Sequence, residues 1–202
     1  MMVRAAVQVH AQTALAVPLR YAQAGTTLAH AALAGAGTFQ TMRHYPQRDV
    51  VDAGAGTRFY YHAHRAGVPE HGHFHLFAHG RRPDDFMHLV ALSLDQRGQP
   101  LRWFTTNRWV TAGRWRPADQ VWPALRRYRV RTHGRLAPVA GWLTAMVALF
   151  ADDLMALLQE RDRLLAPSLA RREAEAVFED RSIDVLSECP ADLRTRIEQL
   201  VA

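Results

Sequence analysis

Apolar and polar residues alternate over residues 57–106 of this chain, and this pattern predicts β-strands. The alternating stretches are RFYYHAH, HGHFHLFAH, FMHLVALSL and PLRWFTT. Side chains two residues apart lie on the same side of a strand, so each stretch has one mainly apolar side. The connecting segments RAGVPE, GRRPDD and DQRGQ are short and contain turn-forming residues, which favours a four-stranded antiparallel meander.

The segments on either side of these strands have the spacing of helices. An alanine-rich stretch over residues 3–35 predicts two helices, the second with Thr26 or Thr27 as its N-cap. Later in the chain the apolar spacing returns to three or four residues. It predicts one long helix over residues 139–165, which Pro167 should end.

A helix over residues 168–179, a short strand SIDVL and a helix opening at Pro190 complete the chain. Because there is no repeat and no low-complexity linker, we expect residues 1–202 to form a single domain, helical from about residue 117. The predicted class is α+β, with one four-stranded antiparallel sheet at about residues 57–106. N-terminal and C-terminal helices should flank this sheet.

Composition narrows the chemistry that this chain can perform. Apolar residues make up 49% of it, enough to bury a core, and Cys189 is the only cysteine. An internal disulfide and a cysteine-rich metal site are therefore excluded. All 25 basic residues are arginine, which together with abundant alanine indicates a GC-rich coding sequence more than selection for phosphate binding. The N-terminus lacks the apolar core of a secretory signal and no apolar run is long enough to span a bilayer, so we expect a cytoplasmic protein without a membrane partner.

The strongest chemical signal is a ladder of five histidines on the first predicted hairpin, residues 57–79. They are His62, His64, His71, His73 and His75. The residues between them are mainly apolar and should face the core, which puts all five imidazoles on the opposite face. In the simplest register, His62 lies opposite His73 and His64 lies opposite His71.

Such a cluster predicts a transition-metal site. Neighbouring imidazoles repel one another once protonated, whereas a bound cation keeps them neutral, and neutral imidazole is the commonest metal ligand in proteins. Five rings exceed one open coordination shell, so some must support the others. The predicted ligands are His62, His64, His73 and His75, with His71 and Glu70 as further candidates. Iron, copper, zinc and manganese all accept this donor set.

Two residues of the hairpin are candidates for a catalytic role. Glu70 immediately precedes the second strand and would supply a carboxylate; its alternative is a solvated turn residue. Tyr60 lies two residues before His62, hence on the same side of the strand, and should line the site. His79 and His88 are lesser candidates.

Two local motifs resemble those of known families. The HAH segment followed by Glu70 resembles the first metal motif of the cupin superfamily, which implies His62, His64 and Glu70 as ligands. The likeness does not extend to the cupin barrel, because the C-terminal half is helical. HGHFHLF is similar to the histidine-triad motif of nucleotide hydrolases and transferases, which would make His73 a nucleophile at an α-phosphate.

A longer resemblance covers most of residues 40–190. The segments MRHYPQRDV, FYYHAH, EHGHFHLF, HLVALSLD and FTTNRWVT are similar to those of an uncharacterised bacterial protein family rich in histidine. No activity is known to us for that family. The resemblance implies a single domain and says nothing about the reaction.

Arginine and tryptophan recur together over residues 102–135. Arg-Trp pairs begin at Arg102, Arg108 and Arg114. Interleaved basic and aromatic residues are typical of single-stranded nucleic acid binding, but we favour buried tryptophans with solvated arginines. Arg102, Arg108 and Asn107 are candidates for binding a small anionic substrate.

These observations favour a metal-dependent enzyme with a mononuclear site, a dinuclear site being the alternative. Its chemistry would be oxygen-dependent with iron or copper, or hydrolytic with zinc, on a small substrate. Three other functions stay open: a non-catalytic metal-binding or sensing protein, a nucleotide hydrolase or transferase using His73, and a nucleic-acid-binding module.

Overall fold

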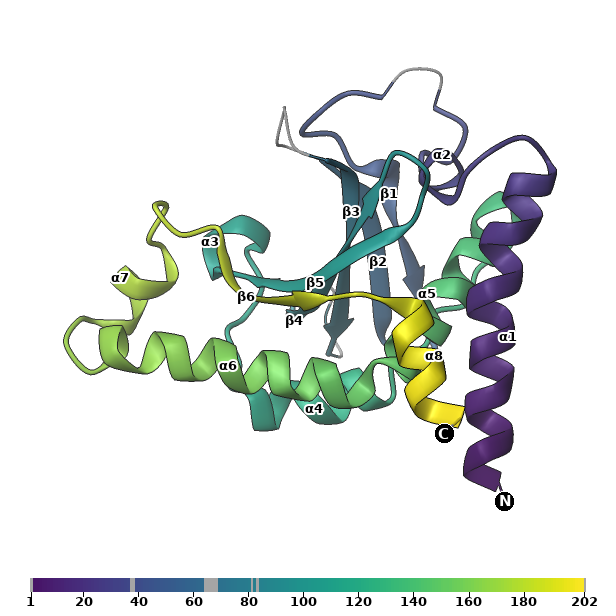
Figure 1. The fold of residues 1–202 in the computed structure, drawn as a ribbon. Helices are drawn as coiled ribbons and strands as arrows, with labels where there is room; N and C mark the ends of the chain where they lie inside the picture. The colour runs from purple at the N-terminus through teal and green to yellow at the C-terminus, as the bar shows by residue number, and fades with distance from the viewer. Residues whose placement is uncertain (1, 37–38, 64–68, 81, 83, 202) are drawn as a thin grey trace.

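The computed structural model describes residues 2–36, 39–63, 69–80, 82 and 84–201 (Figure 1). The strands are β1 (Tyr45–Asp52), β2 (Thr57–His62), β3 (Glu70–His79), β4 (Phe86–Asp95), β5 (Pro100–Thr106) and β6 (Val185–Pro190). The helices are α1 (Met2–Gln23), α2 (Leu28–Ala32), α3 (Arg108–Thr111), α4 (Ala118–Arg126), the 3-10 helix η1 (Gly134–Leu136), α5 (Ala137–Leu149), α6 (Ala151–Leu169), α7 (Ala174–Phe178) and α8 (Leu193–Val201).

The strands form one antiparallel sheet in sequence order, β1-β2-β3-β4-β5-β6. The predicted α+β class is therefore confirmed, and the predicted meander corresponds to β2–β5. The predicted number of four strands is wrong, because the sheet has six. The two additional strands, β1 and β6, lie at its edges.

Edge strands are hard to recognise from a hydrophobic pattern because they bury few side chains. In β1 only Tyr45 and Val50 are buried, and the pairing with β2 shifts register between them. The side chains of β1 therefore show no regular alternation of buried and exposed positions. For β6, part of which was predicted as the strand SIDVL, the sequence gives no sign of its partner. It pairs with β5, where Thr105 lies opposite Ser187.

Two predicted helices differ from the observed ones. The single helix predicted over residues 139–165 is instead α5 and α6, which bend by 74° around Phe150. Phe150 is buried and its ring lies 5.9 Å from that of Trp103, so the bend between the two helices packs against β5. α6 continues past Pro167 to Leu169. The predicted helix over residues 168–179 is reduced to α7.

The helix ends follow local rules more closely. Thr27 is the N-cap of α2, and its side chain accepts a hydrogen bond from the backbone N–H of His30, as the sequence predicts. Pro190 ends β6 instead of opening the last helix, which starts at Leu193.

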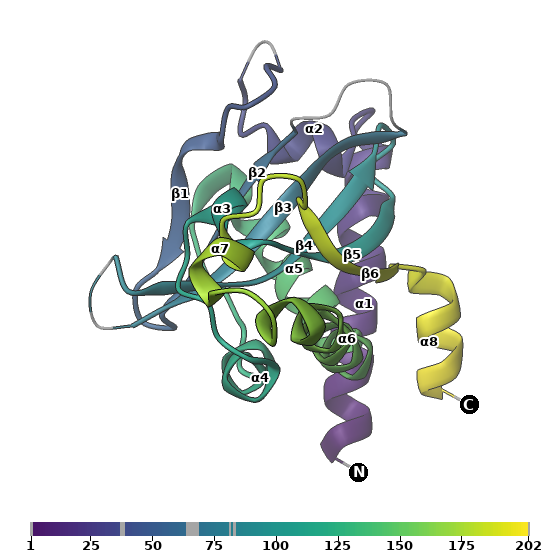
Figure 2. The ribbon, with the colours of Figure 1, turned by 90° about the vertical axis from the view of Figure 1, so that its left-hand side faces the viewer.

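One face of the sheet packs against helices and forms the core. Figure 2 shows α1 and α5 behind the sheet and α3 and α7 in front of it. On the α5 side, Phe74 lies 6.3 Å from Trp142, measured between ring centres. The indole N–H of Trp142 donates to the carbonyl of Ala14 in α1, at 3.2 Å. The predicted core positions of the hairpin are confirmed as buried: Phe59, Tyr61, Ala63, Phe74 and Leu76.

In the part of the chain that the structure describes, no single helix is long and apolar enough to cross a membrane. The bent pair formed by Gly134–Leu149 and Ala151–Leu169 meets that test together, by length and composition only.

Candidate metal centre

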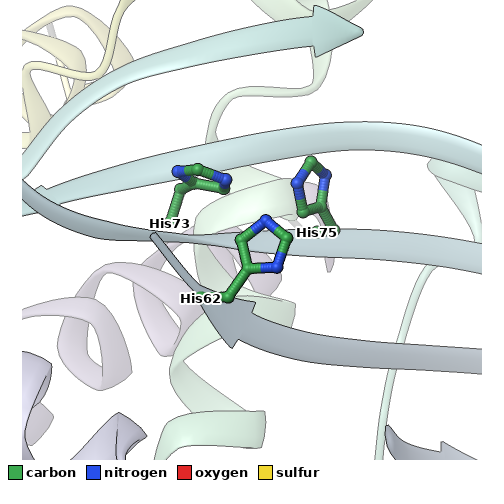
Figure 3. Close-up of side chains that lie close together, drawn as sticks. All are labelled: His62, His73 and His75. Atoms are coloured by element: carbon green, nitrogen blue, oxygen red, sulfur yellow. The ribbon is translucent and has the colours of Figure 1, made fainter. Parts of the chain in front are cut away.

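Three histidines from β2 and β3 gather on the face of the sheet opposite α5. They are His62, His73 and His75 (Figure 3). His62 lies directly opposite His73 in the ladder, as predicted, and Tyr60 lies opposite His75. Because each strand presents alternate residues to this face, β2 contributes one imidazole and β3 contributes two. Their exposed fractions are 7%, 2% and 0% respectively, so the cluster is buried.

The three rings form a nearly equilateral triangle. Their centres are 4.8 Å apart for His62 and His73, 5.0 Å for His62 and His75, and 4.8 Å for His73 and His75. The rings are also nearly perpendicular to one another, with interplanar angles of 80°, 81° and 88°. Each pair of rings is therefore in edge-to-face contact.

This triangle fits the dimensions of a tri-histidine metal site. Metal–nitrogen bonds of about 2.0–2.1 Å put an ion about 3.2 Å from each ring centre, so tetrahedral angles separate the centres by about 5.2 Å. The candidate ligand atoms all lie within 4.8 Å of one another. Bound nitrogens would be about 3.4 Å apart by the same geometry, a difference that small rotations of the rings can close.

A carboxylate and an arginine support His73. The Nδ1 atom of His73 is 2.5 Å from a carboxylate oxygen of Glu70, whose side chain is almost buried. The guanidinium of Arg102 lies 3.7 Å from the other oxygen of Glu70 and also pairs with Glu188 of β6. A carboxylate that accepts from Nδ1–H fixes the ring and directs the lone pair of Nε2 to the ion. Glu70 thus occupies the position of a supporting residue behind His73.

His88 and Thr106 support His75 in the same way. The Nδ1 atom of His75 lies 3.0 Å from Nε2 of His88, and Nδ1 of His88 lies 3.4 Å from the hydroxyl of Thr106. Burial, reinforced by the nearby Arg161 and His73, lowers the pKa of His88 to about 3, so its ring is neutral at ordinary pH. In one arrangement of protons along these two hydrogen bonds, Nδ1–H of His75 donates to Nε2 of His88 and Nδ1–H of His88 donates to the hydroxyl of Thr106. In that arrangement Nε2 of His75 carries the lone pair, as a metal ligand requires.

Aromatic rings surround the cluster. Phe104 of β5 lies 5.2 Å from His73 and Tyr60 lies 5.2 Å from His75, measured between ring centres. Burial and the nearby Asp49 raise the pKa of Tyr60, so its hydroxyl keeps its proton. Tyr60, which the sequence proposes as a catalytic candidate, therefore lines the cluster as a neutral hydroxyl.

The remaining two histidines of the predicted ladder are His64 and His71. His64 lies outside the described residues. The prediction that His71 shares the face of His73 is wrong, because the β3–β4 register shifts between Glu70 and Gly72. The Nδ1 atom of His71 lies 2.7 Å from the hydroxyl of the buried Tyr61.

Gly72 explains this arrangement. A Cβ atom at that position would lie 2.7–2.9 Å from three atoms of the Tyr61 side chain, which is closer than packed atoms approach. The glycine therefore lets Tyr61 lie against the strand and reach His71. In the sequence this glycine simply interrupts the apolar alternation.

The three residues proposed from sequence as substrate contacts lie in different surroundings. Arg102 reaches the centre through Glu70. The side chain of Asn107 is buried, caps α3 at Arg108 and donates to the carbonyl of Val177. Arg108 pairs with Glu175 and Glu179 of α7.

A small pocket lies beside His73. Its lining includes Glu70, Arg102, Phe104 and Thr106, and it is closed by Val110 of α3 and by Asp184 and Val185 at the start of β6. Of the three histidines, only His73 lines this pocket. Its walls come from both halves of the chain.

His44 is a neighbour of the cluster that sequence reasoning missed. Its ring stacks on Tyr60 with centres 3.7 Å apart and lies 5.3 Å from His62, while its Nδ1 atom is 3.5 Å from Asp49. His44 directly precedes β1. Sequence reasoning could have placed His44 near the cluster only by recognising β1 as the neighbour of β2. The irregular pattern of apolar residues in β1 makes that strand hard to recognise.

Comparison with known proteins identifies the family. The model of a domain of unknown function, DUF6969, matches residues 8–191. The chain belongs to the DUF6969 family. The match agrees with the resemblance to an uncharacterised family, and DUF6969 includes β1 to β6 and hence the whole histidine cluster. The cupin-like motif is not confirmed by these comparisons. No curated protein and no solved structure matches the chain.

Proposed function

We propose that this chain is a metalloenzyme in which His62, His73 and His75 hold one transition-metal ion. One observation carries the proposal: three buried imidazoles from paired strands converge until their candidate ligand atoms lie within 4.8 Å of one another. Three protein ligands leave a coordination position for water or substrate, which is typical of catalytic sites, whereas structural sites use four. An all-imidazole donor set suits zinc, copper and iron.

The ion would act as a Lewis acid or redox centre, and residues of the chain would prepare it for that role. Glu70 holds the ring of His73, and Arg102 compensates the charge of Glu70. Phe104 excludes water from the side of the rings that it covers. The substrate would enter through the pocket beside His73, and because this pocket is small we propose a small substrate.

The direct test is elemental analysis of protein purified without a histidine tag. We expect about one metal ion per chain, lost in His62→Ala and in His73→Ala because two imidazoles hold an ion far more weakly than three. His71→Ala is the matched control: it removes a histidine of the same strand that lies with Tyr61, and it should keep its metal.

Two outcomes would count against this assignment. Metal-free wild-type protein after purification and reconstitution would end the proposal. Equal loss of metal in His71→Ala would restore the predicted ladder and contradict the three-residue centre. A redox-active metal would direct the search for a reaction to oxygen chemistry, and zinc would direct it to hydrolysis.

The support from Glu70 gives a second expected result. Glu70→Gln should lower metal affinity by about 10–100-fold while the stoichiometry stays at one, because a neutral amide holds the ring but no longer raises its basicity. Competition with a chromogenic chelator measures the change. Glu188→Gln is the control, since Glu188 shares Arg102 but belongs to a partly exposed pair. Equal affinities for the two variants would show that Glu70 does not act on the ion.

A further inference from the structure

A second pocket has His88 and Thr106 in its wall. Four arginines also line it, from α3, α6 and the segment that joins α3 to α4: Arg108, Arg114, Arg116 and Arg161. No acidic side chain is among its described lining residues, in contrast to the pocket beside His73. A lining of guanidinium groups and hydroxyls without a carboxylate suits a small anion.

The inner wall of this pocket is held rigidly. Arg161 is only 4% exposed, and its guanidinium donates to Asp162 and, at 2.8 Å, to the carbonyl of Arg116. The same guanidinium lies 4.2 Å from the ring centre of Trp115, which stacks on Phe178. The cation therefore cannot move away from the pocket without breaking a packed cluster.

Carboxylates orient two of the other arginines without lining the pocket. Arg108 pairs with Glu175 and Glu179, and Arg114 lies 3.1 Å from Asp85. A carboxylate accepts at most two of the five N–H donors of a guanidinium in a bidentate pair. The remaining donors can serve a second acceptor. No described carboxylate lies within salt-bridge distance of Arg116.

We propose that this pocket binds a small oxyanion, either inorganic phosphate or the phosphate group of an organic molecule. Guanidinium groups match the oxygen geometry of phosphate by bidentate hydrogen bonds. The hydroxyls of Thr106 and Thr111, which also line the pocket, supply further donors. The pocket adjoins the three-histidine cluster through His88 and Thr106. None of His62, His73 and His75 lines it, so the proposal requires no bound metal ion.

Calorimetric titration with inorganic phosphate at constant ionic strength tests the proposal. We expect saturable binding at one site, weakened about tenfold or more in Arg116→Gln and in Arg114→Gln, since each substitution removes a charged hydrogen bond. Both arginines are exposed, so the variants should fold, and a thermal melt verifies this. Arg97→Gln, in the exposed turn between β4 and β5, is the matched control and should bind phosphate as wild type does.

A second titration with glycerol 3-phosphate distinguishes the two sources of the anion. Tighter binding of the ester, with the same dependence on Arg116, supports a group carried by an organic molecule, whereas equal or weaker binding supports free phosphate. Absence of saturable binding for both, or equal weakening in Arg97→Gln, overturns the proposal.

The metal centre and the anion pocket are separated by one further variant. His73→Ala, which should lose its metal, is expected to keep its phosphate affinity. Loss of phosphate binding in folded His73→Ala would contradict a separate pocket. Metal-free wild-type protein that still binds phosphate would contradict only the proposed metal centre.

Discussion

Addition of a strong chelator is expected to lower the melting temperature of the wild-type protein by about 5–15 °C. An ion that binds only the folded chain stabilises it by about 2.7–4.1 kcal/mol when its concentration is 100–1,000 times the dissociation constant. For a domain of about 200 residues, each kcal/mol changes the melting temperature by about 2–4 °C. Differential scanning fluorimetry with and without chelator, followed by re-addition of the metal, measures the shift.

The His73→Ala variant is the control for this experiment. Its melting temperature should not respond to the chelator, because its third ligand is gone, whereas His71→Ala should respond as wild type does. A similar shift in His73→Ala would mean that the chelator removes an ion bound elsewhere. An unchanged wild-type melting temperature would count against a metal bound by the folded state alone.

Replacing Trp103 with alanine is expected to lower the free energy of unfolding by about 3–5 kcal/mol, the usual cost of truncating a large buried aromatic side chain. Trp103 is 0% exposed and packs against Phe150 at the bend between α5 and α6. Trp103→Phe should cost much less because it keeps most of the packing. Urea unfolding followed by circular dichroism measures both changes.

Trp109 is the matched control, since it also follows an arginine in the Arg-Trp series. It lies on the short helix α3, is only partly buried, and bonds to the carbonyl of Ile183. Trp109→Ala should therefore cost clearly less than Trp103→Ala. Comparable losses would contradict the division of this series into core and surface residues. Full burial also removes Trp103 from any role in stacking on nucleic acid bases.

The sequence predicts the hairpin well because the period of a strand is exact. With a period of two, the apolar residues Phe59, Tyr61 and Phe74 can share the core only if His62 and His73 meet on the other face, and this register is observed. A helix N-cap such as Thr27 is equally local and equally predictable.

Tertiary structure decided which side chains surround the imidazoles. A shift of register between Leu76 and Phe77 puts His88 opposite Phe77 and brings its ring to His75. Neither shift in the β3–β4 ladder has a sequence signature that a single chain reveals. The same holds for Glu70, which the sequence offers as a ligand and the structure brings to the Nδ1 atom of His73.

For the histidine ladder, some features follow from the local sequence pattern and others from contacts between distant segments. Alternation along each strand is enough to predict a histidine-rich hairpin, its apolar face and the two rings that lie opposite each other. The convergence of three rings, the contact of His71 with Tyr61 and the pocket lined by β5 and α3 are visible only in the folded chain. Those features depend on bulges and on contacts between distant segments, and local periodicity carries no record of either.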